Sequence, residues 1–513
     1  MKTQYIVKTL STFILTLLIV SCGYHEDVVE ELSISREFAP VDLTARVRNQ
    51  TFVELSWAVN ESVDYYVVEF SADDPNFTNI FQSEIVTASE LPILIRLEGE
   101  TVYSIRVKAV SDRGLNDSSW ALGEATTLSE QIMQPSQIGD IQATQATLRW
   151  EAGLNVTHFI LQPGDIRYDI SASEKASGVA TITGLTGDTE YSAILYNNSK
   201  VRGFADFLTE VDPSTGTVIN SSNDILQMIE NAAPGDVILL EPGDYTSQTG
   251  TATLDKPITV RSLLSYDKAK LGINFEINGG ATDVSLINLD LDGALTVSDV
   301  VRFTGAGNYN SLLLSGCNIH DFARSFIAGN VTDAIVQNVT VENCIVTNIL
   351  TAGGDFIDFR NSDALGVTIT SSTFNNCAPG RDFLRLDAAG TSNGNSICNI
   401  LIDSCTIYAC SNSDSRRILY VRFQTNEVTV QNTLIAETES EGYADRTGVD
   451  ESPTFNNNNY FNAPGFINPD QFIFDASNYT ELDPGFVDPL AGDFTVTNQT
   501  LLDNQVGDPR WRP

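Results

Sequence analysis

Basic side chains are scarce in this chain. Its 513 residues contain 29 Lys and Arg against 67 Asp and Glu, which gives a formal net charge of −38. This acidic excess argues against nucleic acid or an anionic membrane surface as the main partner, because either would be repelled. A polysaccharide of uronic acids would also be repelled, unless a local basic stripe or a bound cation accepted it.

Long apolar runs and histidines are also few. The apolar run near the N-terminus, from about Leu10 to Val20, is shorter than the ~20 residues that a membrane-spanning helix requires. It follows a basic start and therefore predicts a secretory signal that is cleaved from the mature protein. His25, His158 and His320 are far apart in sequence. We do not expect them to form one catalytic group, and we interpret His320 as a turn residue.

The residues after the apolar run contain a short motif. The segment 19–22, Ile-Val-Ser-Cys, resembles a bacterial lipobox, which implies a signal peptide over 1–21 and a lipid on the Cys22 thiol. The acidic Glu26 and Asp27 resemble the tether that routes lipoproteins to the outer surface in Bacteroidetes. The resemblance implies a linker over 22–37 and a lipid anchor in the outer membrane, with the protein exposed at the cell surface.

Two segments with short alternating runs follow the linker. In residues 38–130, Trp57 ends the second run, and a Leu-x-x-x-Thr-x-Tyr pattern from Leu97 to Tyr103 precedes a Val-x-Ala run. This order resembles a fibronectin type III domain. Residues 131–212 repeat it in a degenerate form. Both segments are expected to be β-sandwich spacers, because no exposed aromatic pair suggests that they bind a glycan.

The remaining residues, 213–513, begin with a helical pattern. Ile225, Leu226 and Ile229 have helical spacing, Ser222 or Asn223 is the expected cap, and a Pro-Gly pair stops the helix. The next phrase, Pro-Gly-Asp-Val-Ile-Leu-Leu-Glu-Pro-Gly-Asp-Tyr, resembles the opening of the pectate-lyase-like superfamily. In that superfamily a helix plugs the first coil of a β-helix.

A β-rich phrase then recurs along the chain. Its equivalent positions are 317, 344, 372, 405 and 433, so the steps are 27, 28, 33 and 28 residues. A repeat of this length is typical of a parallel β-helix, in which each coil buries its apolar face against its neighbours. The handedness of parallel crossovers favours a right-handed coil. We therefore predict an all-β protein, a right-handed parallel β-helix with a C-terminal cap, preceded by two fibronectin type III-like sandwiches.

The same register bears on the cysteines. An even number of cysteines in an exported protein usually suggests disulfides. Here the repeat places small side chains in one column and Cys377 with Cys410 in another, which favours free thiols stacked in the bore. At least one disulfide is the alternative. The first column contains Cys317, Cys344, Ser372, Cys405 and Thr433, and Cys398 completes the set of six.

A second strand in each coil carries the candidate site. Side chains alternate across a strand, so Arg and carboxylate groups from successive coils are expected about 4.8 Å apart on one face. Between residues 300 and 425 there are eight Arg and no Lys. Arginine forks bind carboxylates and stack on aromatic rings, and both contacts suit uronates. One possible outward row holds Arg302, Ala328, Asp358, Arg385 and Tyr420, and its flank holds Arg360, Asp387 and Arg422.

The pectate-lyase-like resemblance implies roles for this face. Lyases of the superfamily remove a proton next to a uronate carboxylate with an Arg or Lys base and a cation, and calcium is the candidate cofactor. The catalytic candidates are Arg385, Arg360 and Asp358; the substrate-binding candidates are Arg302, Arg381, Tyr420 and Arg422; and the calcium candidates are Asp355, Asp382 and Asp387.

Other interpretations stay open. The chain lacks the Lys and paired acidic motif of the chondroitinase B and alginate lyase family. Hydrolysis would rely on Asp355 and Asp358, without the Gly-His motif of polygalacturonases. The pairs Arg360–Asp387 and Asp358–Arg385 would, as purely structural cross-strand ion pairs, contribute only ~0–1 kcal/mol each when exposed.

The C-terminal stretch extends the resemblance to nearly the whole mature chain. It contains Asn-Asn-Asn-Asn-Tyr-Phe over 456–461, Asp-Pro-Gly-Phe-Val-Asp-Pro over 483–489 and Gly-Asp-Pro-Arg-Trp over 507–511. With these motifs it resembles the tails of uncharacterised Bacteroidetes lipoproteins encoded beside pectin-degrading enzymes. This implies a polysaccharide-utilisation role, in which the protein binds and cleaves an acidic, pectin-like polysaccharide alongside other proteins of such a system. The alternatives are a non-catalytic surface glycan-binding protein and a structural or protein-interaction scaffold.

Overall fold

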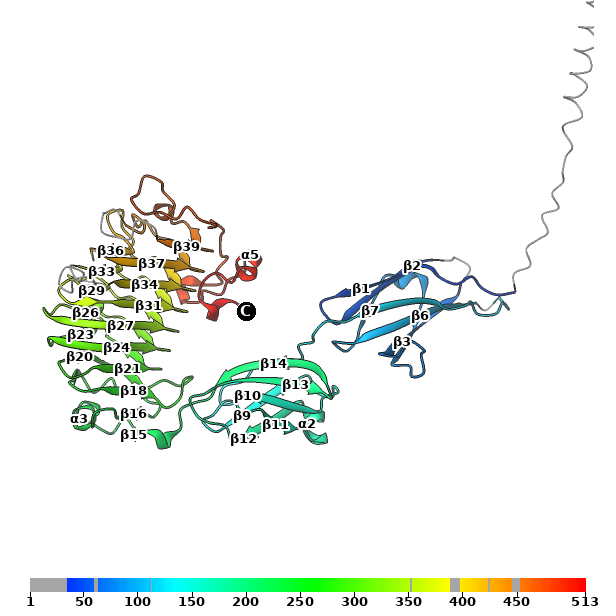
Figure 1. Ribbon diagram of the computed structural model, residues 1–513, viewed down its shortest axis with the longest axis horizontal. Coiled ribbons are helices and arrows are strands. Elements are labelled where there is room, and N and C mark those ends of the chain that lie inside the picture. Colours follow the sequence, from blue (N-terminus) through cyan, green and yellow to red (C-terminus); the bar gives the residue numbers. More distant parts are fainter. Residues whose placement is uncertain are drawn as a thin grey trace, which may run out of the picture. The chain divides into compact units, whose positions relative to one another are not determined.

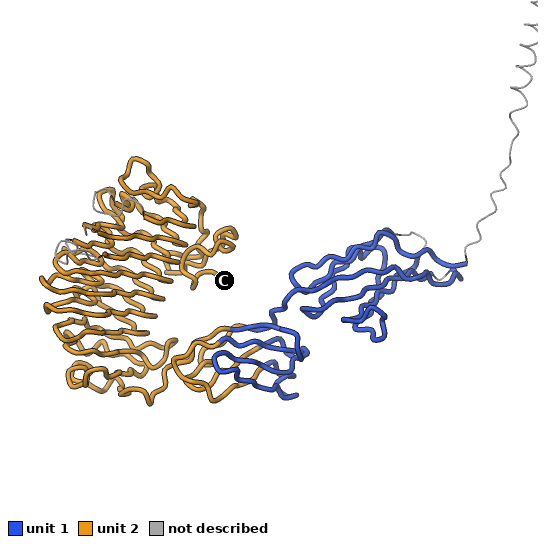
Figure 2. The backbone as a smooth tube through the Cα atoms, in the orientation of Figure 1, with its two compact units in different colours: residues 1–134, 150–178, 192–205 blue, residues 135–149, 179–191, 206–513 orange. Residues whose placement is uncertain are grey.

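The computed structural model describes residues 35–59, 63–111, 113–350, 353–387, 397–422, 425–444 and 453–513. The predicted signal peptide and Cys22 lie outside these residues. Within them, no helix is both long and apolar enough to cross a membrane. The chain divides into two compact units, one of residues 1–134, 150–178 and 192–205 and one of residues 135–149, 179–191 and 206–513 (Figure 2).

Residues 38–130 form the first predicted sandwich. Val53, Leu55 and Trp57 alternate with more exposed neighbours and are buried in its core. The Tyr103 hydroxyl accepts a hydrogen bond from the Glu98 amide at 3.1 Å, which closes the predicted tyrosine corner. One sheet contains β1 (Val41–Arg48), β2 (Phe52–Ala58) and β5 (Ile93–Arg96); the other contains β4 (Gln82–Val86), β3 (Tyr65–Ala72), β6 (Val102–Val110) and β7 (Ala121–Thr126).

Residues 131–212 form the second sandwich, whose strands are complete although its sequence pattern is degenerate. Its corner is the same, because the Tyr191 hydroxyl accepts from the Thr186 amide at 3.0 Å. One sheet contains β12 (Val179–Thr183), β9 (Gln145–Trp150) and β8 (Met133–Gln134); the other contains β11 (Ile166–Asp169), β10 (His158–Gln162), β13 (Glu190–Asn197) and β14 (Lys200–Leu208), with α2 (Ala172–Ser177) between β11 and β12.

The rest of the chain is the predicted parallel β-helix (Figure 1). Helix α3 (Ile225–Asn231) precedes the second strand of the β-helix and buries Ile225 and Ile229, as expected. Its N-cap is Asp224, whose side chain accepts from the Gln227 amide, and not Ser222 or Asn223. The described strands lie in three parallel sheets.

The long sheet contains β15 (Thr217–Ile219), β16 (Val237–Leu240), β18 (Ile258–Ser262), β21 (Asp283–Ile287), β24 (Gly307–Ser315), β27 (Ala334–Glu342), β30 (Asp363–Ala364), β31 (Gly366–Thr370), β34 (Cys398–Asp403), β37 (Asn426–Gln431) and β39 (Thr454–Asn456). The arginine sheet contains β17 (Gly250–Leu254), β20 (Ile273–Ile277), β23 (Asp299–Phe303), β26 (Ser325–Gly329), β29 (Ile357–Phe359), β33 (Leu384–Leu386) and β36 (Leu419–Val421). The third sheet contains β19 (Lys270–Leu271), β22 (Asp290–Asp292), β25 (Asn318–His320), β28 (Ile345–Thr347), β32 (Thr373–Asn375), β35 (Thr406–Tyr408), β38 (Leu434–Ala436) and β40 (Asn459–Phe461).

At the bend between the long sheet and the third sheet, successive coils have a residue in the left-handed backbone conformation. Each described coil from β21 onward places Asn, Gly or Ser at this bend, and these residues tolerate positive φ better than β-branched ones. The recurring phrase in the sequence is therefore two strands on either side of a bend. The bend residues and their φ angles are Asn288 (54°), Gly316 (64°), Asn343 (51°), Ser371 (47°), Ser404 (54°), Asn432 (49°) and Asn457 (53°).

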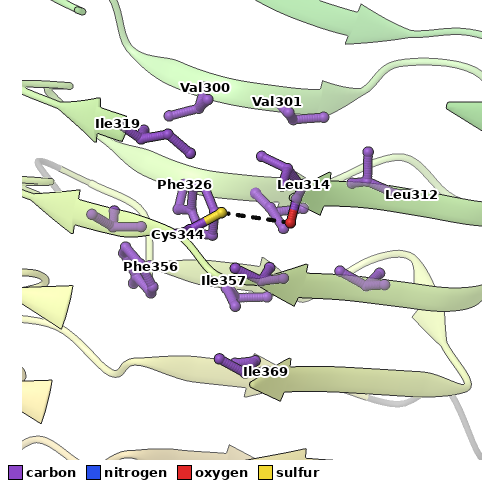
Figure 3. Packing of buried hydrophobic residues seen from close by; sticks show 14 of the residues in the cluster. Val300, Val301, Leu312, Leu314, Ile319, Phe326, Cys344, Phe356, Ile357 and Ile369 are labelled. Carbon is purple, nitrogen blue, oxygen red and sulfur yellow. Dashed lines mark hydrogen bonds between the residues drawn. The ribbon is translucent and has the colours of Figure 1, made fainter. Parts of the chain in front are cut away.

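The predicted column of small side chains lies directly after this bend. All six described cysteines are free and buried, so stacked thiols are confirmed and the disulfide alternative is wrong. The column is also hydrogen-bonded from coil to coil: the Cys344 amide donates to Ser372 Oγ at 3.0 Å, and the Cys405 amide donates to Thr433 Oγ1 at 3.4 Å. Figure 3 shows Cys344 among the apolar side chains of the bore.

The C-terminal cap does more than close the end of the stack. Its last residues return along the outer face of the third sheet, so the chain ends beside the middle of the stack (Figure 1). Trp511 Nε1 donates to Thr373 Oγ1 at 2.7 Å, and Thr373 Oγ1 donates to the buried Asp508 carboxylate at 2.7 Å. Helix α5 (Gln499–Asp503) contributes Leu501 to the small apolar cluster beneath this segment.

Candidate functional site: the arginine face

The predicted outward row is present on the arginine sheet. Arg302 pairs with Ala328, Ala328 with Asp358, Asp358 with Arg385, and Arg385 with Tyr420, each one strand further along the stack. The residues on either side of this row point into the bore and are buried, as Ile357 and Phe359 are. The sequence pattern therefore identified both the face and its register.

A second column lies beneath the arginines and starts each strand. It runs through Asp299, Ser325, Asp355, Asp382 and Arg417, all buried. Each of the three carboxylates accepts a hydrogen bond from the backbone amide of the next residue in this column. The distances are 3.2 Å from Ser325 N to Asp299 Oδ1, 3.3 Å from Asp382 N to Asp355 Oδ1, and 3.0 Å from Arg417 N to Asp382 Oδ1.

Arginine side chains cover these carboxylates from the solvent side. Arg302 Nε and Arg324 Nε each donate to Asp299 at 2.7 Å. Arg417 Nε donates to Asp382 at 3.0 Å. The covering guanidinium groups reach solvent only in part, since the exposed fractions of the side chains are 32% for Arg302 and 25% for Arg324.

Asp355 lies at the centre of the face and joins two coils. Its Oδ2 accepts from Arg360 Nη2 and Arg385 Nη1, both at 3.2 Å. Arg360 also pairs with Asp358, two residues away on its own strand, and Arg385 Nε donates to Asp387 at 2.9 Å. The expected cross-strand pairs Arg360–Asp387 and Asp358–Arg385 do not form, because each arginine reaches the carboxylate of its own strand and the buried aspartate at the strand start.

Tyr420 extends the face beyond the aspartates. The Cζ atoms of three arginines lie near its ring centroid: Arg417 at 4.6 Å, Arg385 at 5.1 Å and Arg422 at 5.9 Å. Cations over an aromatic ring are attracted by its quadrupole, so the ring holds these side chains together. Arg422 is exposed, and Arg381 is half-buried in the turn before β33.

The catalytic roles that the sequence suggested do not fit this geometry well. Burial lowers the pKa of Arg385, but Asp387 and Asp355 outweigh burial and raise it, which opposes a role as the base. The Asp358 side chain is 0% exposed beneath Arg360, so it cannot contact a substrate. Asp355, its partner in the hydrolytic alternative, is 1% exposed, and burial raises the pKa of its carboxyl.

The three calcium candidates do not fit a calcium ion either. Asp355 and Asp382 accept from arginines and backbone amides through both oxygens, and Asp387 Oδ2 accepts from Arg385. Within the described residues, Asp387 Oδ1 is buried without a partner. One oxygen falls far short of the about six to eight that Ca²⁺ takes.

Three members of the face were missed in the sequence. Three residues before each member of the predicted outward row, the sequence has Asp299, Ser325, Asp355, Asp382 and Arg417, a spacing from which this column was predictable. Arg324 lies one residue before Ser325. The charge pairing was not predictable, because some arginines bind an aspartate of their own coil and others, such as Arg324 and Arg417, bind one of the preceding coil.

A groove of about 600 Å³ lies on the outer face of the long sheet. Gly366, Asn338, Asn399 and Thr368 are among its lining residues. Of the described residues that line it, only Glu427 is charged. These residues therefore offer no positive charge for an acidic ligand, in contrast to the arginine face.

Comparison with known proteins adds fold information. Two family models match the β-helix region, a domain of unknown function (DUF4957) over residues 243–377 and another (DUF5123) over residues 400–511. No curated protein matches this chain. The sandwiches are similar to solved fibronectin type III structures.

A two-domain segment of chicken tenascin is 16% identical, and the match covers 33% of this chain and 97% of that one, with a TM-score of 0.23. Domains FN1–FN3 of chicken CNTN1 are 15% identical over 34% of this chain and 64% of that one, with a TM-score of 0.15. The central fibronectin-III array of RIM-binding protein is 21% identical over 34% and 62%, with a TM-score of 0.14.

Proposed function

We propose that this protein is a surface lipoprotein that binds an acidic, pectin-like polysaccharide through the arginine face. The anchor would be the lipid on Cys22, and the sandwiches would hold the β-helix away from the outer membrane. Other proteins of a polysaccharide-utilisation system would act on the bound glycan.

The row of partly exposed guanidinium groups carries this proposal. The face contains seven arginines against five aspartates and Glu276, which is in register with Arg302, so it is weakly positive in a chain of net charge −38. The buried carboxylates orient the arginine forks, which lowers the cost of ordering them around a ligand carboxylate. The arginines that reach solvent are Arg302, Arg324, Arg360, Arg381, Arg385 and Arg422, whereas the buried Arg417 pairs with Asp382 beneath them.

Spacing supports a polymeric ligand. Successive strands of a sheet are about 4.8 Å apart, so the face repeats on the length scale of one sugar unit. Tyr420 adds an aromatic ring that is amphipathic enough to contact a sugar. A chain of uronates along the stack would meet a new guanidinium group at most coils.

Binding is favoured over cleavage because none of the described residues of the face is an available base. Arg385 is held protonated by two carboxylates. The aspartates that could serve instead, Asp355 and Asp358, lie beneath Arg360. A lyase would need a different base or a rearrangement that breaks several charge-assisted hydrogen bonds.

Gel retardation and calorimetry with polygalacturonate test this function. We expect binding that weakens as salt rises, no binding to a neutral glucan, and no growth of unsaturated-uronate absorbance with or without calcium. Arg302→Ala and Arg422→Ala should each weaken binding about tenfold, or about 1.4 kcal/mol. Arg302 is suitable for substitution because Arg324 still pairs with the buried Asp299 when Arg302 is removed.

Arg167→Ala is the matched control. Arg167 is an exposed arginine of the second sandwich that pairs with Asp169, so its loss changes the net charge equally and should leave binding unchanged. Absorbance that grows and is abolished by Arg385→Ala would replace the binding proposal with a lyase. Failure to bind any of a broad panel of acidic glycans would favour the scaffold alternative.

A further inference from the structure

His320 lies in a polar group on the third sheet that the arginine face does not involve. It ends β25, and its neighbours come from the preceding strand β22 and from the turn that follows β25. His320 Nδ1 is 2.9 Å from Asp321 Oδ2 and 3.7 Å from Asp292 Oδ1. The sequence-based interpretation of His320 as a turn residue is therefore wrong, because His320 is the last residue of a strand and the turn begins at Asp321.

We infer that His320, Asp292 and Asp321 form a binding site for a first-row divalent transition ion, with Zn²⁺ as the best fit. One ligand atom from each residue lies within 4.8 Å of the others. Ligands about 2.1 Å from a tetrahedral ion lie about 3.4 Å from one another, and the separations of 2.9 and 3.7 Å from His320 Nδ1 are on either side of that value.

The imidazole distinguishes this group from an ordinary acidic patch. Neutral imidazole with two carboxylates is a donor set that suits zinc and its neighbours, whereas calcium and magnesium prefer oxygen alone. Three protein ligands leave a fourth position for water, as in open zinc sites. With the nearby Asp290, the group carries three carboxylates against one lysine, so a divalent cation balances its charge.

Residues outside the ligand set orient each ligand. Asp290 Oδ1 lies 3.1 Å from His320 Nε2, so this carboxylate can accept the Nε2 proton in the tautomer whose Nδ1 binds an ion, in place of the Nδ1–Asp321 hydrogen bond. Lys270 Nζ contacts Asp292 Oδ2 at 2.9 Å, and Asn348 Nδ2 donates to Asp321 Oδ1 at 3.1 Å. Asp321 therefore keeps Oδ2 toward His320, whereas Asp292 Oδ1 also accepts from the Ala294 amide at 2.8 Å and would bind the ion through its second lone pair.

Metal titration of the purified protein tests this inference. We expect one Co²⁺ per chain, seen as visible d–d absorption, and displacement by stoichiometric Zn²⁺. His320→Gln and Asp321→Asn should each weaken Co²⁺ binding at least about tenfold. His158→Gln, which removes a histidine of the second sandwich, and Asp470→Asn, which removes an exposed carboxylate, should leave binding unchanged.

His320→Gln and Asp321→Asn each remove one ligand, so the second variant still tests the site if the first one misfolds. Both ligand side chains are partly exposed, 28% for His320 and 33% for Asp321, so we expect the β-helix to persist, which far-UV circular dichroism checks. Absence of d–d bands would overturn the inference. Bands that survive His320→Gln, or near-ultraviolet thiolate charge transfer that places the ion at a cysteine, would overturn it as well.

Discussion

Arg385 Nη1 donates to the buried carboxylate of Asp355 at 3.2 Å, across thirty residues of sequence and one coil of the stack. The same Asp355 oxygen accepts from Arg360, so one carboxylate joins two neighbouring strands of the arginine face. This arrangement makes Asp355 the residue on which the geometry of the face most depends.

Asp355→Ala is therefore expected to destabilise the β-helix. It leaves two guanidinium groups without their buried partner and removes the acceptor for the Asp382 amide. Breaking a buried ion pair costs about 3–5 kcal/mol, and partial exposure of the arginines places the expected loss at the lower end. Scanning calorimetry should show a lower Tm. Asp169→Asn, an exposed partner of Arg167, should change it little, and equal effects of the two would contradict the assignment.

Thr433 tests the internal column. Its hydroxyl accepts from the Cys405 amide and donates to the Gln431 carbonyl at 2.8 Å, with the side chain fully buried. Thr433→Val keeps the shape but leaves the amide without its acceptor, which should cost about 1–3 kcal/mol in the free energy of unfolding. Thr433→Ser retains the oxygen and should be closer to the natural protein. If Thr433→Val is as stable as Thr433→Ser, the hydrogen bond from the Cys405 amide does not contribute to stability.

The thiols are expected to be free but unreactive. Burial raises the pKa of Cys398 to about 12, and that of Cys405 well above its ordinary value. A Cys22→Ser variant should give no reaction with a thiol reagent when folded and six thiols per chain in denaturant. Fewer than six, restored by a reductant, would indicate a disulfide after all.

Asp363 should make stability depend on pH. Burial, and then the charge of Asp333, raise the pKa of Asp363 to about 6, above the ~3.9 of an unfolded chain. The folded state holds this proton more tightly, so its contribution to the free energy of unfolding is fully present below about pH 4. It falls as pH rises to about 6, by on the order of 2 kcal/mol.

Asp363→Asn isolates this contribution. The variant should gain stability relative to the natural protein as pH rises from 4 to 7, measured by denaturant unfolding. Asp470→Asn, which alters an exposed carboxylate, should show no such trend. A stability difference for Asp363→Asn that stays constant across this range would show that the carboxyl titrates as it does in water.

The sequence predicted the fold well because the determinants are local and repeated. The spacing between Cys317 and Cys344, in the column of small side chains, gave the length of one coil. The same spacing predicted that Asp358 and Arg385 are neighbours on adjacent strands, as they are. Alternation of side chains along each strand then gave the row of Arg302, Ala328, Asp358, Arg385 and Tyr420 as one possible outward row. The two tyrosine corners were recognisable for the same reason, since Tyr103 and Tyr191 each lie five residues from the amide that they bind.

The chemistry of the face was harder to predict. Alternation says which way Asp358 points but not that Arg360 folds back over it. The group around His320 joins a strand end, a turn and the neighbouring coil, so its members are separated by up to 30 residues and share no motif. Such contacts depend on side-chain reach, for which the sequence carries no direct signal.

The return of the C-terminal segment along the third sheet affects how the stack comes apart. Trp511 is fastened to Thr373 and Arg510 to Asn343, 138 and 167 residues earlier. The last coil therefore cannot peel away on its own, since its removal must first pull this strap from coils much nearer the middle. A protease that digests processively from the carboxyl end meets its hardest step at the outset.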